Sequence, residues 1–70
     1  MSKLILKKLA KQILKFRKEL DITQEELALK TGISRSTIAM IETAKRDVTI
    51  SKLAKISKAL KISVSDLVNF

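Results

Sequence analysis

A polar run at residues 34–37, Ser-Arg-Ser-Thr, gathers one guanidinium and three hydroxyl groups in four consecutive positions. It follows Gly32, the only glycine of the chain, and opens a stretch in which Ile38 and Ile41 recur at helical spacing. With the isoleucines turned toward a core, the polar groups face outward. Arg35 carries a planar fork of N–H donors, and hydroxyls both donate and accept. Such a surface is suited to the reading of base edges.

The residue types that most other chemistry needs are missing from the sequence. It contains no His and no Cys, and its seven Asp and Glu residues are scattered. Nucleophilic and acid–base catalysis rely mainly on such side chains, and thiolate or imidazole metal sites require them. We therefore expect no catalytic site, no metal and no cofactor, and the chain is predicted not to be an enzyme.

Basic residues dominate the charge, which is +8 over 70 residues. Residues 1–20 hold seven Lys and Arg against one Glu, whereas residues 21–34 hold three acidic residues against one Lys. An excess of this size fits a polyanionic partner. The alternative is that the lysines of the first and fourth predicted helices only keep a small protein in solution.

The length of the chain provides for one domain with a modest core. No apolar run approaches the ~18 residues that span a bilayer. Lysines interrupt the apolar positions at the N-terminus, which a secretory signal would not tolerate. A cytoplasmic location is the default expectation.

Hydrophobic periodicity predicts an all-α fold. Helices are expected at residues 4–20, 24–30, 35–43, 50–60 and 63–68, with a polar loop at 44–48. The first helix should bury a stripe made of Leu6, Leu9/Ala10, Ile13, Phe16 and Leu20.

Four hydroxyl residues precede the predicted helices after the first, at the positions where N-caps are needed: Thr23, Ser34, Thr49 and Ser63. Two of them have an acidic residue three positions later, Glu26 and Asp66, and so form capping boxes. These caps support the same helix boundaries as the hydrophobic pattern.

Three stretches carry a resemblance to a known family. FRKELDITQEELA at 16–28, TGISRSTIAMIE at 31–42 and LAKISKALKISVSDLV at 53–68 resemble the phage-repressor/Cro family of helix-turn-helix DNA-binding domains. The resemblance implies a five-helix, lambda-repressor-like fold over residues 13–70, with residues 1–12 as a basic extension of the first helix. Members of this family bind operator DNA as dimers and act as transcriptional regulators or as DNA-binding antitoxins.

By position, the resemblance assigns base readout to the third helix, namely to Arg35, Ser36, Thr37 and Met40. Arg35 would pair with O6 and N7 of guanine, and Met40 would meet a thymine methyl group. The alternative for Met40 is packing in the core.

The resemblance assigns phosphate contacts to Gln24 at the start of the second helix and to Thr43, Lys45 and Arg46 after the third. The alternative is that Gln24 is merely solvated and that the two cations are ordinary surface charge. Arg17 and Glu42 occupy positions that form a partly buried salt bridge in the family, and we expect that pair to be structural.

Several positions depart from the family pattern. Ala44 stands where glycine is frequent and Val48 where proline is frequent, and Asp21 and Lys61 replace glycines that are common at helix ends. Thr31 is more polar than usual for the turn. These departures leave the path of residues 43–48 open.

The N-terminal extension has three interpretations: it lies on a membrane surface, binds phosphates, or lengthens the first helix and covers the domain or a dimer partner. We favour the last and expect no membrane binding, because the chain has no Trp or Tyr to anchor it at an interface. At the other end, Val64, Val68 and Phe70 are candidates for a dimer patch, whereas Leu67 is expected in the core.

The sequence therefore predicts a sequence-specific, double-stranded DNA-binding transcriptional regulator, a dimeric repressor that reads an inverted-repeat operator through its third helix. The alternative is a DNA-binding antitoxin whose partner is a toxin protein. Single-strand binding is disfavoured, because the only aromatic residues are Phe16 and Phe70.

Overall fold

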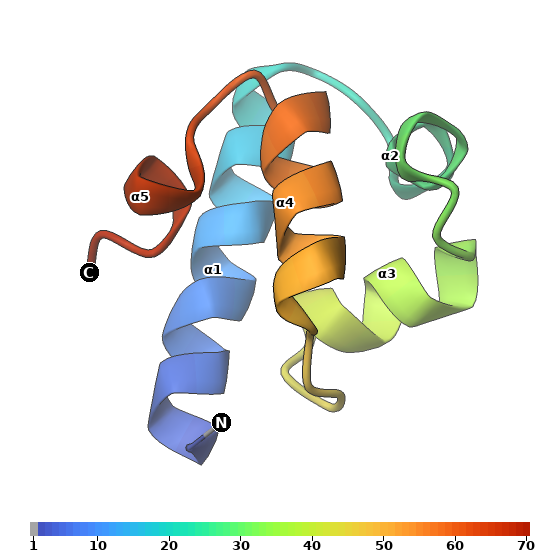
Figure 1. Cartoon of the computed structure of the whole chain (residues 1–70). Coiled ribbons are helices and arrows are strands. Elements are labelled where there is room, and N and C mark those ends of the chain that lie inside the picture. The colour runs from blue at the N-terminus through green and yellow to red at the C-terminus, as the bar shows by residue number, and fades with distance from the viewer. Residues whose placement is uncertain (1) are drawn as a thin grey trace.

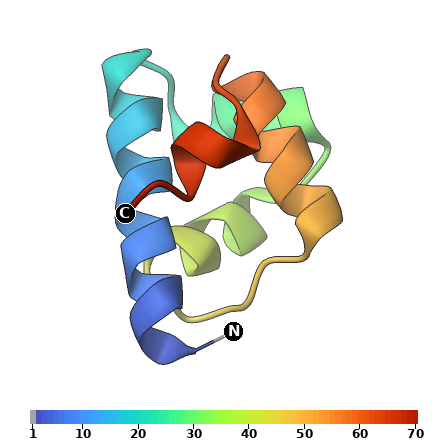
Figure 2. The ribbon, with the colours of Figure 1, turned by 60° about the vertical axis from the view of Figure 1, so that its left-hand side comes forward.

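The computed structural model of the chain describes residues 2–70 and contains five helices in that range (Figure 1). They are α1 (Lys3–Glu19), α2 (Gln24–Thr31), α3 (Arg35–Glu42), α4 (Ile50–Ala59) and α5 (Val64–Leu67). α2 packs on α3 and α4, α1 packs on α3 and α5, and α5 also contacts α4. In Figure 2, α5 lies between α1 and α4. The predicted all-α, five-helix architecture with a long first helix is confirmed.

Each helix begins at a Ser or Thr whose side-chain oxygen accepts a hydrogen bond from a backbone N–H of the first turn. The four predicted caps are all present, and both predicted capping boxes are closed. Ser2 provides a fifth cap, which was not predicted, by accepting from the Ile5 N–H at 3.1 Å. Each cap contributes about 0.5–2 kcal/mol, so together they fix where the helices start.

A single hydrophobic core draws on every helix. Its most deeply buried side chains are Leu9, Ile13, Leu27, Ile38, Ile41, Ile56, Leu60 and Leu67. Ile38 and Ile41 lie one turn apart on the same face of α3. Because both are buried, the rotation of α3 about its axis is fixed and its opposite face is presented to solvent.

The turn between α2 and α3 is held by Thr31 and Gly32. Gly32 has a φ of 72°, in the left-handed region that glycine adopts without a steric cost. The buried Thr31 hydroxyl donates to the Leu27 carbonyl at 2.8 Å and accepts from the Ile33 N–H at 3.2 Å. The unusual polarity of Thr31 is thus explained: its hydroxyl satisfies backbone groups that the turn would otherwise leave buried and unpaired.

One expectation about burial was wrong, and one buried residue was not expected. Leu20, predicted in the buried stripe, is 37% exposed, because α1 ends at Glu19 and the chain turns away at Asp21. Val48, predicted within a polar loop, is 6% exposed and belongs to the core. The apolar side chain closes the core between α3 and α4, which the polar residues around it in the sequence did not indicate.

Helix ends differ from the prediction by one residue in several places. α1 starts one residue earlier than expected, α2 runs one residue further, and α3 and α4 each end one residue sooner. Thr43 and Leu60 are C-caps instead of helical residues.

Three non-glycine residues adopt left-handed backbone conformations directly after helices: Asp21 (φ 57°), Ala44 (φ 58°) and Lys61 (φ 60°). These are the positions at which the family resemblance implies glycine. The backbone therefore takes the conformation typical of glycine at all three positions, including Ala44 at the start of the α3–α4 loop. The left-handed conformation costs about 1–2 kcal/mol for a residue with a Cβ, and less for Asp, whose side chain bonds locally.

Candidate nucleic-acid interface

The outward face of α3 carries the four residues predicted to read bases. Arg35 and Ser36 are exposed, and Thr37 and Met40 are half-buried. Met40 therefore neither enters the core fully nor stands free in solvent. We call these four residues the outward row. They lie on the less buried side of α3 because Ile38 and Ile41 occupy the core-facing side of the same two turns.

Local hydrogen bonds engage the hydroxyls at the start of α3. Ser34 Oγ accepts from the Thr37 N–H at 3.2 Å and donates to Thr37 Oγ1 at 2.8 Å. Ser34 Oγ and Ser36 Oγ lie 3.3 Å apart. Thr37 is thus part of the N-cap as well as of the outward row, whereas Arg35 has its guanidinium in solvent.

Behind α3, three side chains form a buried hub that joins three helices: Arg17 of α1, Gln24 of α2 and Glu42 of α3. Arg17 Nε donates to Glu42 Oε2 at 2.6 Å and Arg17 Nη2 donates to Oε1 at 3.1 Å. Gln24 Nε2 donates to the same Oε1 at 3.0 Å. The side chains of Arg17 and Glu42 are only 11% and 3% exposed. The ion pair that the resemblance implies is therefore present, and it is bidentate.

Two further contacts complete the hub. Arg17 Nη1 donates to the Ile22 carbonyl at 2.7 Å, which ties the α1–α2 connection to the same guanidinium. Gln24, the first residue of α2, donates one amide N–H to Glu42. The amide group has a second N–H that this bond does not use. Within residues 2–70, every buried side-chain nitrogen and oxygen has a hydrogen-bond partner. Gln24 thereby supports the recognition helix, and its predicted phosphate contact stays a prediction.

The three residues predicted to contact phosphate after α3 are Thr43, Lys45 and Arg46, and all of them are exposed. The Lys45 N–H donates to the Met40 carbonyl at 2.9 Å, which closes the C-terminal end of α3. The left-handed Ala44 and the buried Val48 then hold the loop at both of its ends. The two cations consequently project from a loop with a defined path.

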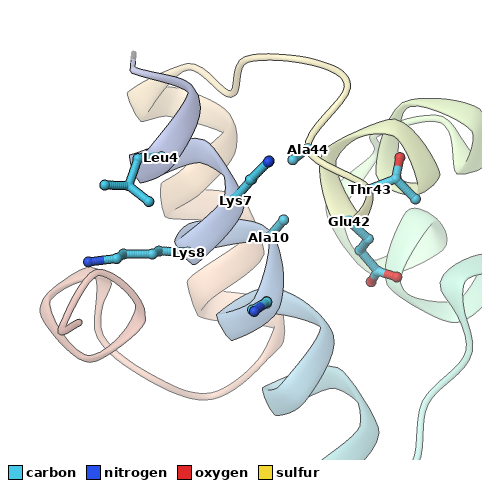
Figure 3. Close-up of a pocket in the computed structure, with 8 residues that line it drawn as sticks. Leu4, Lys7, Lys8, Ala10, Glu42, Thr43 and Ala44 are labelled. Atoms are coloured by element: carbon cyan, nitrogen blue, oxygen red, sulfur yellow. The ribbon is translucent and has the colours of Figure 1, made fainter.

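Lys7 and Lys11, which were not among the predicted site residues, lie beside the C-terminal end of α3. Together with Thr43 and Ala44 they border a hollow of about 360 Å³ (Figure 3). The only signal in the sequence was lysines spaced four apart, a pattern that recurs along α1. That spacing does not tell which lysine meets α3.

The residues predicted to form a dimer patch lie on α5 and the C-terminal tail. Val64, Val68 and Phe70 are 36%, 41% and 50% exposed, whereas Leu67 is fully buried as expected. Gln12 Nε2 holds this tail to α1 through the carbonyls of Asp66 and Asn69, at 3.5 and 3.4 Å. The three side chains are available for a contact, and their role stays a prediction.

No other chemistry is evident in the described part of the chain. Residues 2–70 hold no group of three metal-binding side chains, and none of the helices in that range could span a bilayer. What the geometry offers is a helix-turn-helix with an exposed polar row, flanked by cations.

Comparison with known proteins gives consistent relatives. A helix-turn-helix transcriptional regulator of Methanocaldococcus jannaschii, itself uncharacterised, is 40% identical over 47 residues, which cover 67% of this chain and 71% of that protein. Control protein C.SmaI of Serratia marcescens is 37% identical over 59 residues, covering 84% and 70% of the two chains. The crystal structure of the restriction-modification controller protein C.AhdI from Aeromonas hydrophila superposes with a TM-score of 0.87 at 29% identity, covering 89% and 94%.

The family match falls on the elements described above. The helix-turn-helix family HTH_3 matches residues 13–67, which run from the middle of α1 to the end of α5 and include the hub, the turn and the outward row of α3. The chain belongs to this family.

Proposed function

We propose that the protein is a transcriptional regulator that binds double-stranded DNA sequence-specifically as a homodimer. The observation that carries this is the orientation of α3: two buried isoleucines fix the helix, which presents Arg35 and Ser36 to solvent, with Met40 half-buried. The regulators and controller proteins named above support the same function.

The dimensions of α3 fit the major groove. Its eight residues span about 12 Å, and the groove is about 12 Å wide. A helix laid in the groove therefore has phosphates close to both of its ends. Gln24, which donates to Glu42 at the last residue of α3, lies with Thr43, Lys45 and Arg46 at the C-terminal end of the helix.

Within that arrangement each base-reading residue has a distinct role. The exposed guanidinium of Arg35 pairs with O6 and N7 of a guanine, and such a bidentate pair discriminates by about 1–3 kcal/mol. Ser36 hydrogen-bonds a base or a phosphate, and the half-buried Met40 meets a thymine methyl group. Thr37, bonded to Ser34, supports the start of the helix and lies beside the groove.

The dimer uses the exposed apolar side chains Val64, Val68 and Phe70, which lie together on α5 and the tail. Two recognition helices then enter major grooves about 34 Å apart, and half-sites lie about 10 bp from centre to centre. Occupation of such an operator blocks polymerase sterically, so the regulator acts as a repressor.

The relatives that are controller proteins indicate which DNA regions to search first for an operator. We suggest the promoter of the gene itself and of any neighbouring restriction or modification genes, because C.SmaI is a control protein and C.AhdI a restriction-modification controller. These relatives lend no support to the antitoxin alternative.

Selection of bound duplexes from a random DNA pool at about 150 mM salt tests the proposal, since that ionic strength suppresses binding through phosphates alone. The expected result is an enriched inverted repeat with half-site centres about 10 bp apart. Binding that vanishes as salt rises, with no enriched sequence, would refute sequence-specific recognition.

A further inference from the structure

A hollow with a basic rim lies where the first two turns of α1 pass the C-terminal end of α3. Leu4, Ala10 and Ala44 give it an apolar floor, and Lys7 and Lys11 stand at its α1 side. Figure 3 shows the Lys7 side chain directed toward Ala44. The basic N-terminal segment therefore does not project away from the domain but lies beside the loop that carries Lys45 and Arg46.

The charges around this hollow are uncompensated. The carboxylate that lines it, Glu42, is occupied by Arg17 and Gln24. Within the described residues neither Lys7 nor Lys11 forms an ion pair. Lys8 also lines the hollow, but its ammonium lies over the Phe70 ring at 5.9 Å. Among the lysines of the hollow, Lys7 and Lys11 are thus the two that have neither a ring nor a carboxylate partner within the described residues, and they border the loop predicted to contact phosphate.

We propose that Lys7 contacts the phosphate backbone of bound DNA beside the C-terminal end of α3, with Lys11 behind it as a weaker, longer-range charge. This contact rests on the proposed function, because it assumes the orientation of α3 in the major groove that was proposed there. The phosphates that pass Thr43 and Lys45 run next to Ala44, and the flexible four-carbon stem of Lys7 extends toward the same place. α1 becomes the third element of the interface, after α3 and the α3–α4 loop.

A polyanion is a better occupant than a single small anion. The floor of the hollow is apolar and offers few hydrogen-bond donors, so an isolated phosphate would find little besides the two ammonium groups. A DNA strand that α3 already holds needs no further donors in the hollow: it contacts the ammonium groups when its phosphates pass along the rim. Contacts of this kind add affinity without adding sequence information.

The experiment measures the dependence of affinity on salt for the wild type and for Lys7→Ala, on the selected operator duplex and on a scrambled duplex of equal length. A phosphate contact contributes about 0.9 to the slope of log K against log salt. We expect Lys7→Ala to lower that slope by about one per protomer and to weaken both duplexes alike. When salt is raised from 50 to 200 mM, the affinity of the Lys7→Ala dimer should therefore fall about tenfold less than that of the wild-type dimer.

Two variants control for charge and for folding. Lys7→Arg keeps the charge and should keep the wild-type slope. Lys55→Ala removes the same charge from an exposed position in the middle of α4, where Lys55 borders a different hollow together with Lys30 and Lys58. It should leave the slope unchanged. Thermal unfolding followed by circular dichroism checks that each variant is folded.

The outcomes separate this inference from the proposed function. A wild-type slope for Lys7→Ala, together with a reduced slope for Lys45→Ala, would overturn the α1 contact and leave the proposed function standing. Equal changes for Lys7→Ala and Lys55→Ala would also overturn it, because net charge alone would then explain the effect. A wild-type protein that selects no duplex would overturn both.

Discussion

Truncation of Glu42 to alanine should remove a large share of the stability of the domain. The carboxylate accepts three hydrogen bonds, two from Arg17 and one from Gln24, and its side chain is 3% exposed. Without it, the Arg17 side chain, only 11% exposed, keeps the Ile22 carbonyl as its one remaining acceptor. Leaving one charge of a buried pair unpaired costs about 3–5 kcal/mol.

That cost is large for a chain of this size. Domains are stabilised by about 0.05–0.15 kcal/mol per residue, which for 70 residues corresponds to a total of roughly 3.5–10 kcal/mol. The loss is thus at least about a third of the total, and at the lower end of that range Glu42→Ala is partly unfolded at room temperature. Because the hub joins α1, α2 and α3, the whole helix-turn-helix should lose its structure together and not in parts.

Urea unfolding followed by circular dichroism measures the effect, with Glu25→Ala as the control. Glu25 is an exposed acid in the first turn of α2, and its removal should cost less than about 1 kcal/mol. The double variant Arg17→Ala/Glu42→Ala should be more stable than the sum of the single losses predicts, because it strands no charge. Urea midpoints at the wild-type value for both single variants would refute the structural role of the hub.

Four further outcomes are expected. Arg35→Ala should cost about 1–3 kcal/mol on the operator and relax preference at one base pair; equal losses on operator and random duplexes would contradict its base-reading role. Lys45→Ala should weaken all sequences alike and lower the salt slope by about one per protomer, as titrations at several salt concentrations will show. Ala44→Gly should stabilise the fold by about 0.5–1 kcal/mol in urea unfolding, as relief of left-handed strain exceeds the entropy cost of glycine, whereas the helix-interior control Ala54→Gly should destabilise it by about 1 kcal/mol. Val68→Glu should raise the dimer dissociation constant at least about tenfold in sedimentation equilibrium, because it introduces a charge into an apolar contact.

Much of the fold is readable in the sequence because local signals agree with one another. Every predicted cap from Thr23 to Ser63 starts a helix, and Ile38 and Ile41 are buried as their spacing predicts. The ion pair of Arg17 and Glu42 came from the family resemblance, since nothing in the local pattern joins residues that far apart.

What the sequence did not reveal depends on tertiary placement. Leu20 fits the helical stripe, yet the helix ends before it and leaves it exposed. Val48 lies among polar neighbours, yet the loop carries it back to the core. Lys7 and Lys8 are neighbours in the sequence and both line the hollow beside α3, but only the ammonium of Lys8 lies over the Phe70 ring. Each case is decided by which element packs beside the residue, and periodicity does not contain that information.

The two sides of α3 differ in burial, and this difference affects how the protein can evolve. Within eight residues, Ile38, Ile41 and Glu42 are buried and hold the fold, whereas Arg35 and Ser36 are exposed. Substitutions at exposed positions away from such buried features change stability by only about 0.5 kcal/mol. If α3 reads bases as proposed, changes at Arg35 and Ser36 would alter the preferred operator at little cost in stability, without stabilising mutations elsewhere.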